Sequence, residues 1–399
     1  MDNVISIKQE RNYGIDFLRI VSMIMVLVLH ILGHGWVLDN GNNIKFNNYM
    51  AWFLEIACYG ATNIFGIISG YVGYKSKHKY ANILYLNLQV TLILLVTITV
   101  YKLRYPADVK LDDFKKASMP FAYYVLWYYR AYFCMFFFIP FMNMAVSKMS
   151  RNEGRLMIFS IFFIFTMIPT FFNNDAYDTN YGYSALWLSM MYLTGAYLAK
   201  YKVSDKYKWW HLLLIYFICV LVTFGWKYQP LEFYFFKDLV NYSSPTVYIY
   251  SIALVLLFAK FKFHKVPKHV IKFFTPLAFG VYVIHVSPYF WAKFMDNRFK
   301  TLGGINPFVF PFAVIGIAIL LFICFALMDY VRYLLFKLCR VKKFFTFLEN
   351  KIRKLCSKIF KEDSNELVTD STLVEENNID TLEKSSQIEV ENVDENLKE

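Results

Sequence analysis

The sequence has few charged residues and no closely spaced cysteine pairs, and both shortages restrict the class of protein. Only 18% of its 399 residues are charged whereas 57% are hydrophobic, a balance that excludes a water-soluble protein of this length. The six cysteines are scattered singly, without the close pairing of zinc sites, redox motifs and disulfide frameworks: Cys58, Cys134, Cys219, Cys324, Cys339 and Cys356. We interpret them as small apolar residues and expect no metal site.

The charges are divided unevenly along the chain. Residues 362–399 contain 13 acidic and 2 basic side chains, so the rest of the chain has a net charge of +23, although the whole chain has +12. In a soluble protein such a basic excess would suggest a nucleic-acid partner. Here the basic residues lie between apolar blocks, which is typical of membrane topology, and we expect no nucleic-acid partner.

Ten segments are apolar enough to cross a membrane, since a hydrocarbon core about 30 Å thick needs roughly 20 apolar residues in a helix. The predicted spans are about 15–36, 49–72, 82–101, 121–146, 156–172, 184–200, 211–227, 245–263, 273–293 and 308–336. The fold class is therefore an all-α polytopic membrane protein with about ten transmembrane helices over residues 15–336. The first span follows Lys8 and Arg11 as a signal peptide would, but no small-residue cleavage site follows, so we expect it to be retained.

The second predicted span contains Gly60, Gly66 and Gly70. Glycines at such spacing allow two membrane helices to approach closely. We therefore expect close helix packing there, which also explains the small and polar character of the segment around Asn63 and Ser69.

The distribution of Lys and Arg between alternate loops predicts the orientation, because positive residues are retained on the cytoplasmic side. They are concentrated after the last span and in residues 1–14, 75–79, 148–155, 200–208 and 260–272. The N-terminus and the C-terminus are therefore expected in the cytoplasm. The loops expected outside are 37–48, 102–120, 173–183, 228–244 and 294–307.

Two segments follow the predicted spans. Residues 337–361 are basic, and their apolar residues recur at helical spacing: Phe344, Phe345, Leu348, Ile352, Leu355 and Ile359. This pattern predicts an amphipathic helix on the anionic inner leaflet. The acidic residues 362–399 cannot bury a core, so we expect a disordered cytoplasmic tail, which is either simply solvated or binds a partner.

Ionisable residues inside the predicted spans are the candidates for a site, because each costs a few kcal/mol in the membrane. Arg19 and His30 lie 11 residues apart in the first span. This separation is about three helical turns, so both residues share one helix face, about 16 Å apart along the axis. Arg19 is expected near the cytoplasmic end and His30 in the outer half. A purely structural membrane protein does not need such a pair.

Further ionisable residues fall at middle or outer depth and are expected to line one polar cavity with His30: Glu55, Arg130, His285 and, at the rim, His34. Each has an alternative explanation. Arg130 follows an aromatic stretch and could anchor its helix at the interface, and His285 could be a helix-to-helix hydrogen-bonding residue. His34, four residues after His30, has the spacing of a metal-ligand pair, but no third ligand is identifiable.

These residues also carry a resemblance to a known family. The segment at 11–30, RNYGIDFLRIVSMIMVLVLH, resembles the start of the integral membrane acyltransferase 3 family, whose signature is Arg or Lys, ten residues and then His; Arg19 and His30 fit it. Two later segments are similar to the family, in particular to its forms from Gram-positive bacteria: ATNIFGIISGYVGY at 61–74 and LWYYRAYFCMFFFIPFMN at 126–143. The segment FGVYVIH at 279–285 resembles the late span of the family. The resemblance covers roughly residues 10–340.

The resemblance implies a multi-pass enzyme of the bacterial plasma membrane. It would take an acyl group, commonly acetyl, from cytoplasmic acyl-CoA and deliver it to a hydroxyl of an extracytoplasmic glycan or lipid-linked sugar. Acyl-CoA would be a donor substrate rather than a permanently bound cofactor, and membrane lipids would surround the protein. We expect no SGNH-type esterase domain of the kind fused to some members, so the acyl group would pass directly to its acceptor.

The same resemblance suggests roles for the candidate residues. His30 would act either as a general base or as a transient acyl carrier. Glu55 would orient its imidazole, Arg130 would stabilise the tetrahedral oxyanion, and His285 completes the catalytic candidates.

The donor end is expected on the cytoplasmic side. Arg19 would hold CoA phosphates together with Lys75, Lys77 and Lys79 of the following inner loop. The family often has two basic residues three apart in this region, whereas these lysines alternate.

Two rival functions stay open at this point. A transporter or flippase for a lipid-linked sugar is favoured by the many aromatic residues and by proline-interrupted spans, but no internal repeat relates two halves of the chain. A glycan polymerase usually has a long outer loop with catalytic arginines, whereas the longest outer loop here is under about 20 residues. The outer loop at 173–183 is rich in Asn, Asp and Tyr, which suits sugar binding but also an ordinary membrane interface.

Overall fold

The computed structural model describes residues 11–39, 44–123, 126–229 and 238–359. Within these ranges the chain is helical and contains no strand. The chain divides into two compact units. The first unit consists of residues 1–78 and 82–339, and the second of residues 79–81 and 340–399.

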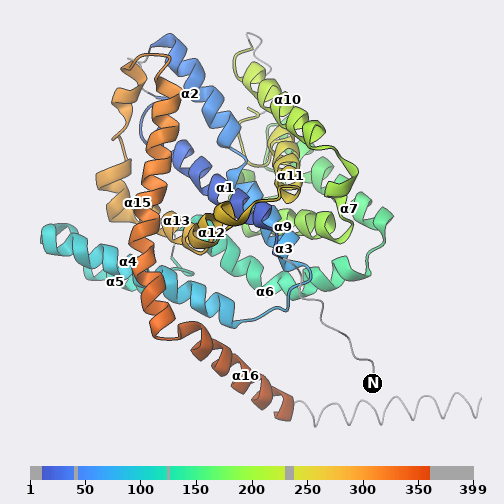
Figure 1. Cartoon of the computed structure of the whole chain (residues 1–399), viewed down its shortest axis with the longest axis vertical. Coiled ribbons are helices and arrows are strands. Elements are labelled where there is room, and N and C mark those ends of the chain that lie inside the picture. Colours follow the sequence, from blue (N-terminus) through green and yellow to red (C-terminus); the bar gives the residue numbers. More distant parts are fainter. Residues whose placement is uncertain (1–10, 40–43, 124–125, 230–237, 360–399) are drawn as a thin grey trace, which may run out of the picture. The chain divides into compact units, whose positions relative to one another are not determined.

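The first unit contains almost all of the helices (Figure 1). The helices up to residue 200 are α1 (Tyr13–Leu32), α2 (Lys45–Cys58), α3 (Ala61–Gly73), α4 (Ala81–Arg104), η1 (Pro106–Asp108), α5 (Leu111–Ser118), α6 (Trp127–Lys148), α7 (Arg151–Phe162), η2 (Phe163–Met167), α8 (Ile168–Phe171), η3 (Asn180–Gly182) and α9 (Ala185–Lys200). The later ones are η4 (Val203–Lys206), α10 (Trp209–Lys227), α11 (Pro245–Ala259), α12 (Lys265–Phe274), η5 (Thr275–Leu277), α13 (Ala278–Val286), α14 (Pro288–Phe290), η6 (Trp291–Met295), η7 (Lys300–Gly304) and α15 (Phe310–Leu338).

Eight helical stretches in the described residues are long and apolar enough to cross a membrane, so the chain is an all-helical, multi-pass membrane protein, as predicted. They are Tyr13–Leu32, Lys45–Gly73, Ala81–Arg104, Trp127–Lys148, Arg151–Phe171, Trp209–Lys227, Lys265–Val286 and Phe310–Leu338. The other two predicted spans, 184–200 and 245–263, correspond to α9 and α11. With 16 and 15 residues these helices fall short of the roughly 20 that a bilayer needs. The orientation of the chain stays a prediction.

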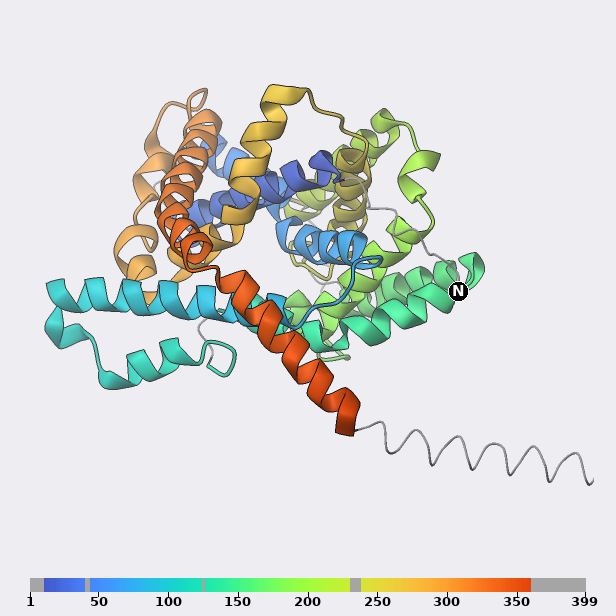
Figure 2. The ribbon, with the colours of Figure 1, turned by 60° about the horizontal axis from the view of Figure 1, so that its bottom comes forward.

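Helix α1 is the central helix of the first unit (Figures 1 and 2). It packs against α2, α3, α11, α12, α13 and α15. Its first turn is capped by Asn12, whose side-chain oxygen accepts the N–H groups of Gly14 and Ile15. The side-chain amide of Asn12 also donates to the carbonyl of Ala259 at the end of α11, over 2.9 Å. The cap therefore fixes both the start of α1 and its contact with α11.

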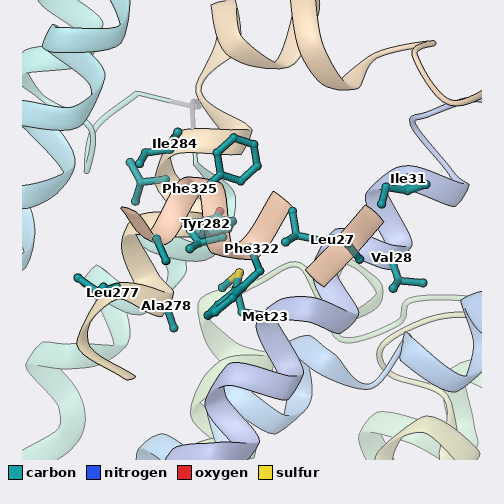
Figure 3. Packing of buried hydrophobic residues seen from close by; sticks show 14 of the residues in the cluster. Met23, Leu27, Val28, Ile31, Leu277, Ala278, Tyr282, Ile284, Phe322 and Phe325 are labelled. Atoms are coloured by element: carbon teal, nitrogen blue, oxygen red, sulfur yellow. The ribbon is translucent and has the colours of Figure 1, made fainter. Parts of the chain in front are cut away.

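The apolar side of α1 packs into the largest hydrophobic cluster of the described residues. Met23, Leu27, Val28 and Ile31 contribute from α1, and they pack with residues of α13 and α15 (Figure 3). All four side chains are buried. Burying an aliphatic side chain of this size stabilises a fold by about 1.5–3 kcal/mol where water is the alternative, and in a bilayer its close packing plays the larger part. The cluster thus holds α13 beside the C-terminal half of α1.

The second predicted span is broken into α2 and α3 between Cys58 and Ala61. Tyr250 of α11 packs its ring against Gly60 and donates its hydroxyl to the carbonyl of Ile56 over 2.8 Å. The hydroxyl of Tyr216 donates to the carbonyl of Ala57 over 3.1 Å. Because a break in a membrane helix frees backbone groups that must be satisfied inside the protein, these hydroxyls stabilise the interruption.

Helices α3 and α9 cross at unusually close range. A Cβ added to Gly70 would lie 1.9 Å from the carbonyl oxygen of Tyr192, and one added to Gly195 would lie 1.9 Å from that of Ile67. A Cβ on Gly66 would meet the Met191 side chain at 2.7 Å. The close packing predicted from the glycines of this span is therefore confirmed, and its partner is α9.

We expect Gly195→Ala to destabilise the protein by at least about 1–3 kcal/mol, because backbone atoms rather than a movable side chain fill the space. Gly316→Ala is the matched control, since nothing lies within 4 Å of a Cβ at that position in α15. Thermal unfolding of the purified proteins in detergent measures both. Equal melting temperatures for the two variants would contradict the close crossing of α3 and α9.

In the second unit, the helix predicted within residues 337–361 is present as α16 (Val341–Ile359). Glu349 accepts the backbone N–H of Ala81 over 3.0 Å and the guanidinium of Arg353 over 2.8 Å. Burial raises the pKa of Glu349, but these hydrogen bonds outweigh it, so the pKa is lowered and the carboxylate stays charged. Its attachment to the inner leaflet stays a prediction, and the predicted tail at 362–399 lies outside the described residues.

Candidate active site

A cavity of about 560 Å³ lies within the first unit. Its walls come from α1, α2, α3, α4, α6, η5 and α13, with Tyr183, Tyr242 and Trp291 contributed by segments between the long helices. On α1 the lining residues run from Arg19 to His30, a distance of about 16 Å along the axis, and Gly33 and His34 continue the wall after the helix ends. Arg19 and His30, the two residues expected to share one face of α1, both lie on this wall.

A hydrogen-bonded histidine pair lies on the wall between α1 and α13. The Nδ1 of His30 is 2.9 Å from the Nε2 of His285, and the Nδ1 of His285 is 2.6 Å from the carbonyl oxygen of Val281. His285 is fully buried and is not itself part of the cavity surface. His285 therefore forms a hydrogen bond with His30 without lining the cavity itself.

The carbonyl of Val281 determines the direction of this hydrogen-bond chain. A carbonyl can only accept, so the Nδ1 of His285 carries a hydrogen. A neutral His285 then has a bare Nε2, which accepts from the Nδ1–H of His30. In the neutral pair, the remaining Nε2 of His30 has no hydrogen and keeps its lone pair. The arrangement thus gives His30 one basic nitrogen, which is the form a general base or a nucleophile requires.

The rim of the cavity beside His30 is formed by Trp291 and His34. The Trp291 ring lies 4.9 Å from that of His30 and 4.8 Å from that of His34. Backbone hydrogen bonds of 3.0 Å from Asn297 to His34 and from Phe299 to Gly35 attach the segment after α13 to the end of α1.

His34 adds no positive charge beside His30 at neutral pH. Burial lowers the pKa of His34, and the opposing effect of the carboxylates of Asp296 and Asp39 is smaller. Its imidazole is therefore neutral at pH 7, and the ring serves the rim as an uncharged polar group.

At the other end of the α1 wall, Arg19 is held by an acidic residue of its own helix. One guanidinium nitrogen donates to Asp16 over 2.8 Å, and Arg11 forms a second ion pair with the same carboxylate. Asp16 is only 5% exposed. A guanidinium has five N–H groups, so several remain for a ligand in the cavity. Sequence reasoning gave Asp16 no role, although the spacing of three residues within one helix was the available signal.

Glu55 lies on α2, shortly before the break, and lines the cavity. Its side chain is 8% exposed, and its Oε2 has no hydrogen-bond partner among the described residues. No hydrogen bond between Glu55 and His30 is present in the described structure, and the partner of the imidazole is His285 instead. Glu55 therefore brings a carboxyl oxygen without a described partner to the wall of the cavity.

The remaining predicted site residues do not line the cavity. Arg130 lies on α6 outside the set of lining residues. Lys75 and Lys77 are exposed in the segment after α3, and Lys79 belongs to the second unit. The structure thus brings together Arg19, His30, Glu55 and His285, with His34 at the rim.

Aromatic rings form a further part of the cavity wall, near the break between α2 and α3. Tyr183 lies 4.6 Å from Trp127 and 4.8 Å from Tyr242, and Tyr59 lies 4.7 Å from Tyr242. All four rings line the cavity. We refer to Tyr59, Trp127, Tyr183 and Tyr242 as the aromatic cluster.

A buried ion pair that sequence reasoning missed lies on α15. Arg332 donates to both carboxylate oxygens of Asp329, and its Nε is 2.9 Å from the Oδ1 of Asp329. It also donates to the hydroxyl of Tyr85 on α4 over 3.0 Å. Asp329 and Arg332 are 1% and 7% exposed. A Cβ at Gly280 would lie 2.0 Å from the carboxyl carbon of Asp329, so the pair packs directly on the backbone of α13. An acid and a base three residues apart inside an apolar span were the available signal.

The fold and the cavity describe a multi-pass membrane protein with a histidine pair in a polar and aromatic pocket. A family model described as the acyltransferase domain of acyltransferase 3 matches residues 12–329, which is most of the chain. The chain therefore belongs to the acyltransferase 3 family and is a membrane acyltransferase, with an acyl donor and an acyl acceptor as its substrates. No curated protein and no solved structure matches the chain.

Proposed function

We propose that the protein is an O-acyltransferase that moves an acyl group, most simply acetyl, from cytoplasmic acyl-CoA to a hydroxyl of an extracytoplasmic glycan or lipid-linked sugar. The observation that carries this proposal is the chain from His30 through His285 to the carbonyl of Val281, on the wall of one cavity with Arg19. It gives a basic nitrogen and a cationic anchor at separate depths of the same wall.

His30 acts as a general base in this proposal. Its Nε2 removes the proton of the acceptor hydroxyl as the hydroxyl oxygen bonds to the thioester carbonyl carbon. The carbon–sulfur bond then breaks, and the departing thiolate takes the proton from His30. Throughout the step the Nδ1–H of His30 stays hydrogen-bonded to His285, which holds the ring in place and stabilises its charged form.

The donor occupies the Arg19 end of the cavity. A phosphate of CoA accepts hydrogen bonds from the guanidinium groups that Asp16 does not use. Lys75 and Lys77 are exposed on the segment after α3, and they remain candidates for the outer phosphates of the same molecule. The pantetheine arm is narrow and extended, which suits the long wall of α1 between Arg19 and His30.

The acceptor occupies the aromatic cluster. Pyranose rings stack on aromatic faces through their C–H groups, while their hydroxyls need polar partners. The four rings of the aromatic cluster supply the faces, and the unpartnered Oε2 of Glu55 supplies a hydrogen-bond acceptor or donor, depending on its protonation. Both features lie on the same cavity as His30.

The decisive experiment is mass analysis of the surface polysaccharides from cells with the wild-type chain, with His30→Ala and without the gene. We expect one acyl group per repeat in the first sample and none in the other two, at equal membrane levels of the two proteins. Retention of the acyl group with His30→Ala would overturn the proposal. A fall in the amount of glycan with its modification intact would favour a transporter or a polymerase.

Arg19→Ala is expected to raise the KM for acetyl-CoA more than tenfold, because a charge-assisted contact to phosphate contributes about 1.5–3 kcal/mol. The acceptor KM should change little. Arg11→Ala is the matched control, because it removes the other ion pair of Asp16 without touching the cavity. Initial rates at varied acetyl-CoA measure both variants, and an equal rise for donor and acceptor would show that Arg19 is structural.

A further inference from the structure

Two residues that line the cavity each carry a buried polar atom without a hydrogen-bond partner among the described residues. These atoms are the Oε2 of Glu55 and the hydroxyl oxygen of Tyr282. Buried polar groups in folded proteins are almost always paired, so an unpaired group on the wall of a cavity indicates an atom that a ligand completes. Glu55 was a candidate from the sequence, whereas Tyr282 was not.

The ring of Tyr282 is firmly held beside the histidine pair. Tyr282 is on α13, three residues before His285, and its ring lies 6.1 Å from the rings of both His285 and Tyr128. The side chain is 7% exposed and belongs to the hydrophobic cluster around α1 and α13 (Figure 3). The ring of His30 is 5.1 Å from that of His285. His30 and Tyr282 are thus both neighbours of His285, and both reach the cavity.

The surroundings of the phenol leave its hydrogen available. The backbone amides of Tyr128 and Tyr129 act on the phenol oxygen, although neither makes a hydrogen bond of normal geometry to it. These amides belong to the first turn of α6, which no side chain caps, so they carry the positive end of the helix dipole. The positive end of the α6 dipole beside the phenol oxygen directs the O–H hydrogen away from these amides and makes the phenol a stronger hydrogen-bond donor.

We propose that Tyr282 donates its O–H to the thioester carbonyl oxygen of the acyl donor and stabilises the oxyanion of the tetrahedral intermediate. The inference rests on the proposed function and adds a catalytic residue to it. As the acceptor oxygen bonds to the carbonyl carbon, the electron pair of the C=O bond moves to the oxygen that Tyr282 contacts. When that pair returns, the carbon–sulfur bond breaks, the thiolate takes its proton from His30, and Tyr282 keeps its own.

Tyr282 fills the role that the sequence suggested for Arg130. Arg130 does not line the cavity, so it cannot contact the reacting carbonyl in this arrangement. A neutral phenol also suits the site electrostatically, since it brings a donor to the oxyanion without introducing a second cation beside the imidazolium that His30 becomes.

The test is Tyr282→Phe in the purified full chain, which removes one oxygen atom and keeps the packed ring. The probes are acetyl-CoA and polysaccharide extracted from cells that lack the gene, with release of free CoA as the readout. We expect kcat to fall about 10²- to 10³-fold, while the KM for acetyl-CoA changes by less than about threefold. The melting temperature should be unchanged or higher, because the lost hydroxyl has no partner in the described structure.

Tyr192→Phe is the matched control. Tyr192 is as deeply buried, but its hydroxyl donates to Asn143 over 2.9 Å and does not line the cavity. This variant should melt at a lower temperature and keep its kcat. A wild-type kcat for Tyr282→Phe overturns the inference, and so does a lower melting temperature, which would reveal a structural partner of the hydroxyl.

The wild-type protein and His30→Ala separate this inference from the proposed function. The proposed function fails if the wild-type protein releases no CoA, or if His30→Ala releases CoA at the wild-type rate. If CoA release depends on His30 and Tyr282→Phe releases CoA at the wild-type rate, only the role of Tyr282 fails.

Discussion

Replacing His285 by leucine is expected to lower the rate of acyl transfer about 10²- to 10⁴-fold, which is the range that a positioned acid–base group contributes. Leucine cannot accept the Nδ1–H of His30, so the imidazole loses its fixed orientation and the support of its charged form. The loss should appear in kcat and not in the KM for acetyl-CoA, because His285 does not line the cavity. CoA release by the purified variant measures both.

His285→Gln is the discriminating companion variant. Its side-chain carbonyl can still accept from His30, and its amide can donate as the Nδ1–H of His285 does to the carbonyl of Val281. We expect it to be at least tenfold more active than His285→Leu. If both variants lose activity equally, His285 acts through packing alone, and if neither loses any, the direction of the hydrogen-bond chain has no bearing on catalysis.

Arg332→Met is expected to destabilise the protein by about 3–5 kcal/mol, because it leaves the carboxylate of Asp329 buried without its counter-charge. The double variant Asp329→Leu with Arg332→Met should recover much of this loss, since an apolar pair of similar volume leaves no buried charge. Thermal unfolding in detergent measures each variant.

Tyr85→Phe is the control for that pair. It removes a single hydrogen bond to Arg332 and should cost only about 1 kcal/mol. The position of the pair matters because Asp329 packs on Gly280, five residues before His285 on the same helix. An Arg332→Met protein that melts like the wild type would show that the pair does not hold α13.

The sequence was informative wherever a residue's position along one helix decides the outcome. The spacing of Arg19 and His30 predicts a shared face because every helix has the same period, and both residues line the cavity. Apolar length likewise predicts the long spans, since it depends on composition alone. The family assignment rests on the same local motifs and is confirmed over residues 12–329.

The sequence was uninformative where tertiary contacts decide. The segment between Cys58 and Ala61 is as apolar as its surroundings, so its break could not be predicted from hydropathy; the hydroxyls of Tyr216 and Tyr250 stabilise it from other helices. Arg130 was selected by depth, but depth does not determine which side of α6 faces the cavity.

The pairing of His30 with His285 joins residues 255 positions apart, which no periodicity can reveal. Tyr282 was hidden for a related reason. A tyrosine in an aromatic-rich membrane protein stands out only when its hydroxyl proves to have no partner among the described residues.

The hydrogen-bond chain of the histidine pair ends at the Val281 carbonyl, so the pair cannot conduct protons. A peptide carbonyl accepts a hydrogen bond but cannot pass a proton onward, so a proton gained by His30 has no route through His285 toward either face of the membrane. In the proposed mechanism it returns to the reacting molecules, where the leaving thiolate takes it up. Each catalytic cycle then takes up no proton from either side of the membrane and releases none. Acyl transfer by this site should therefore proceed at the same rate with the transmembrane proton gradient present or collapsed.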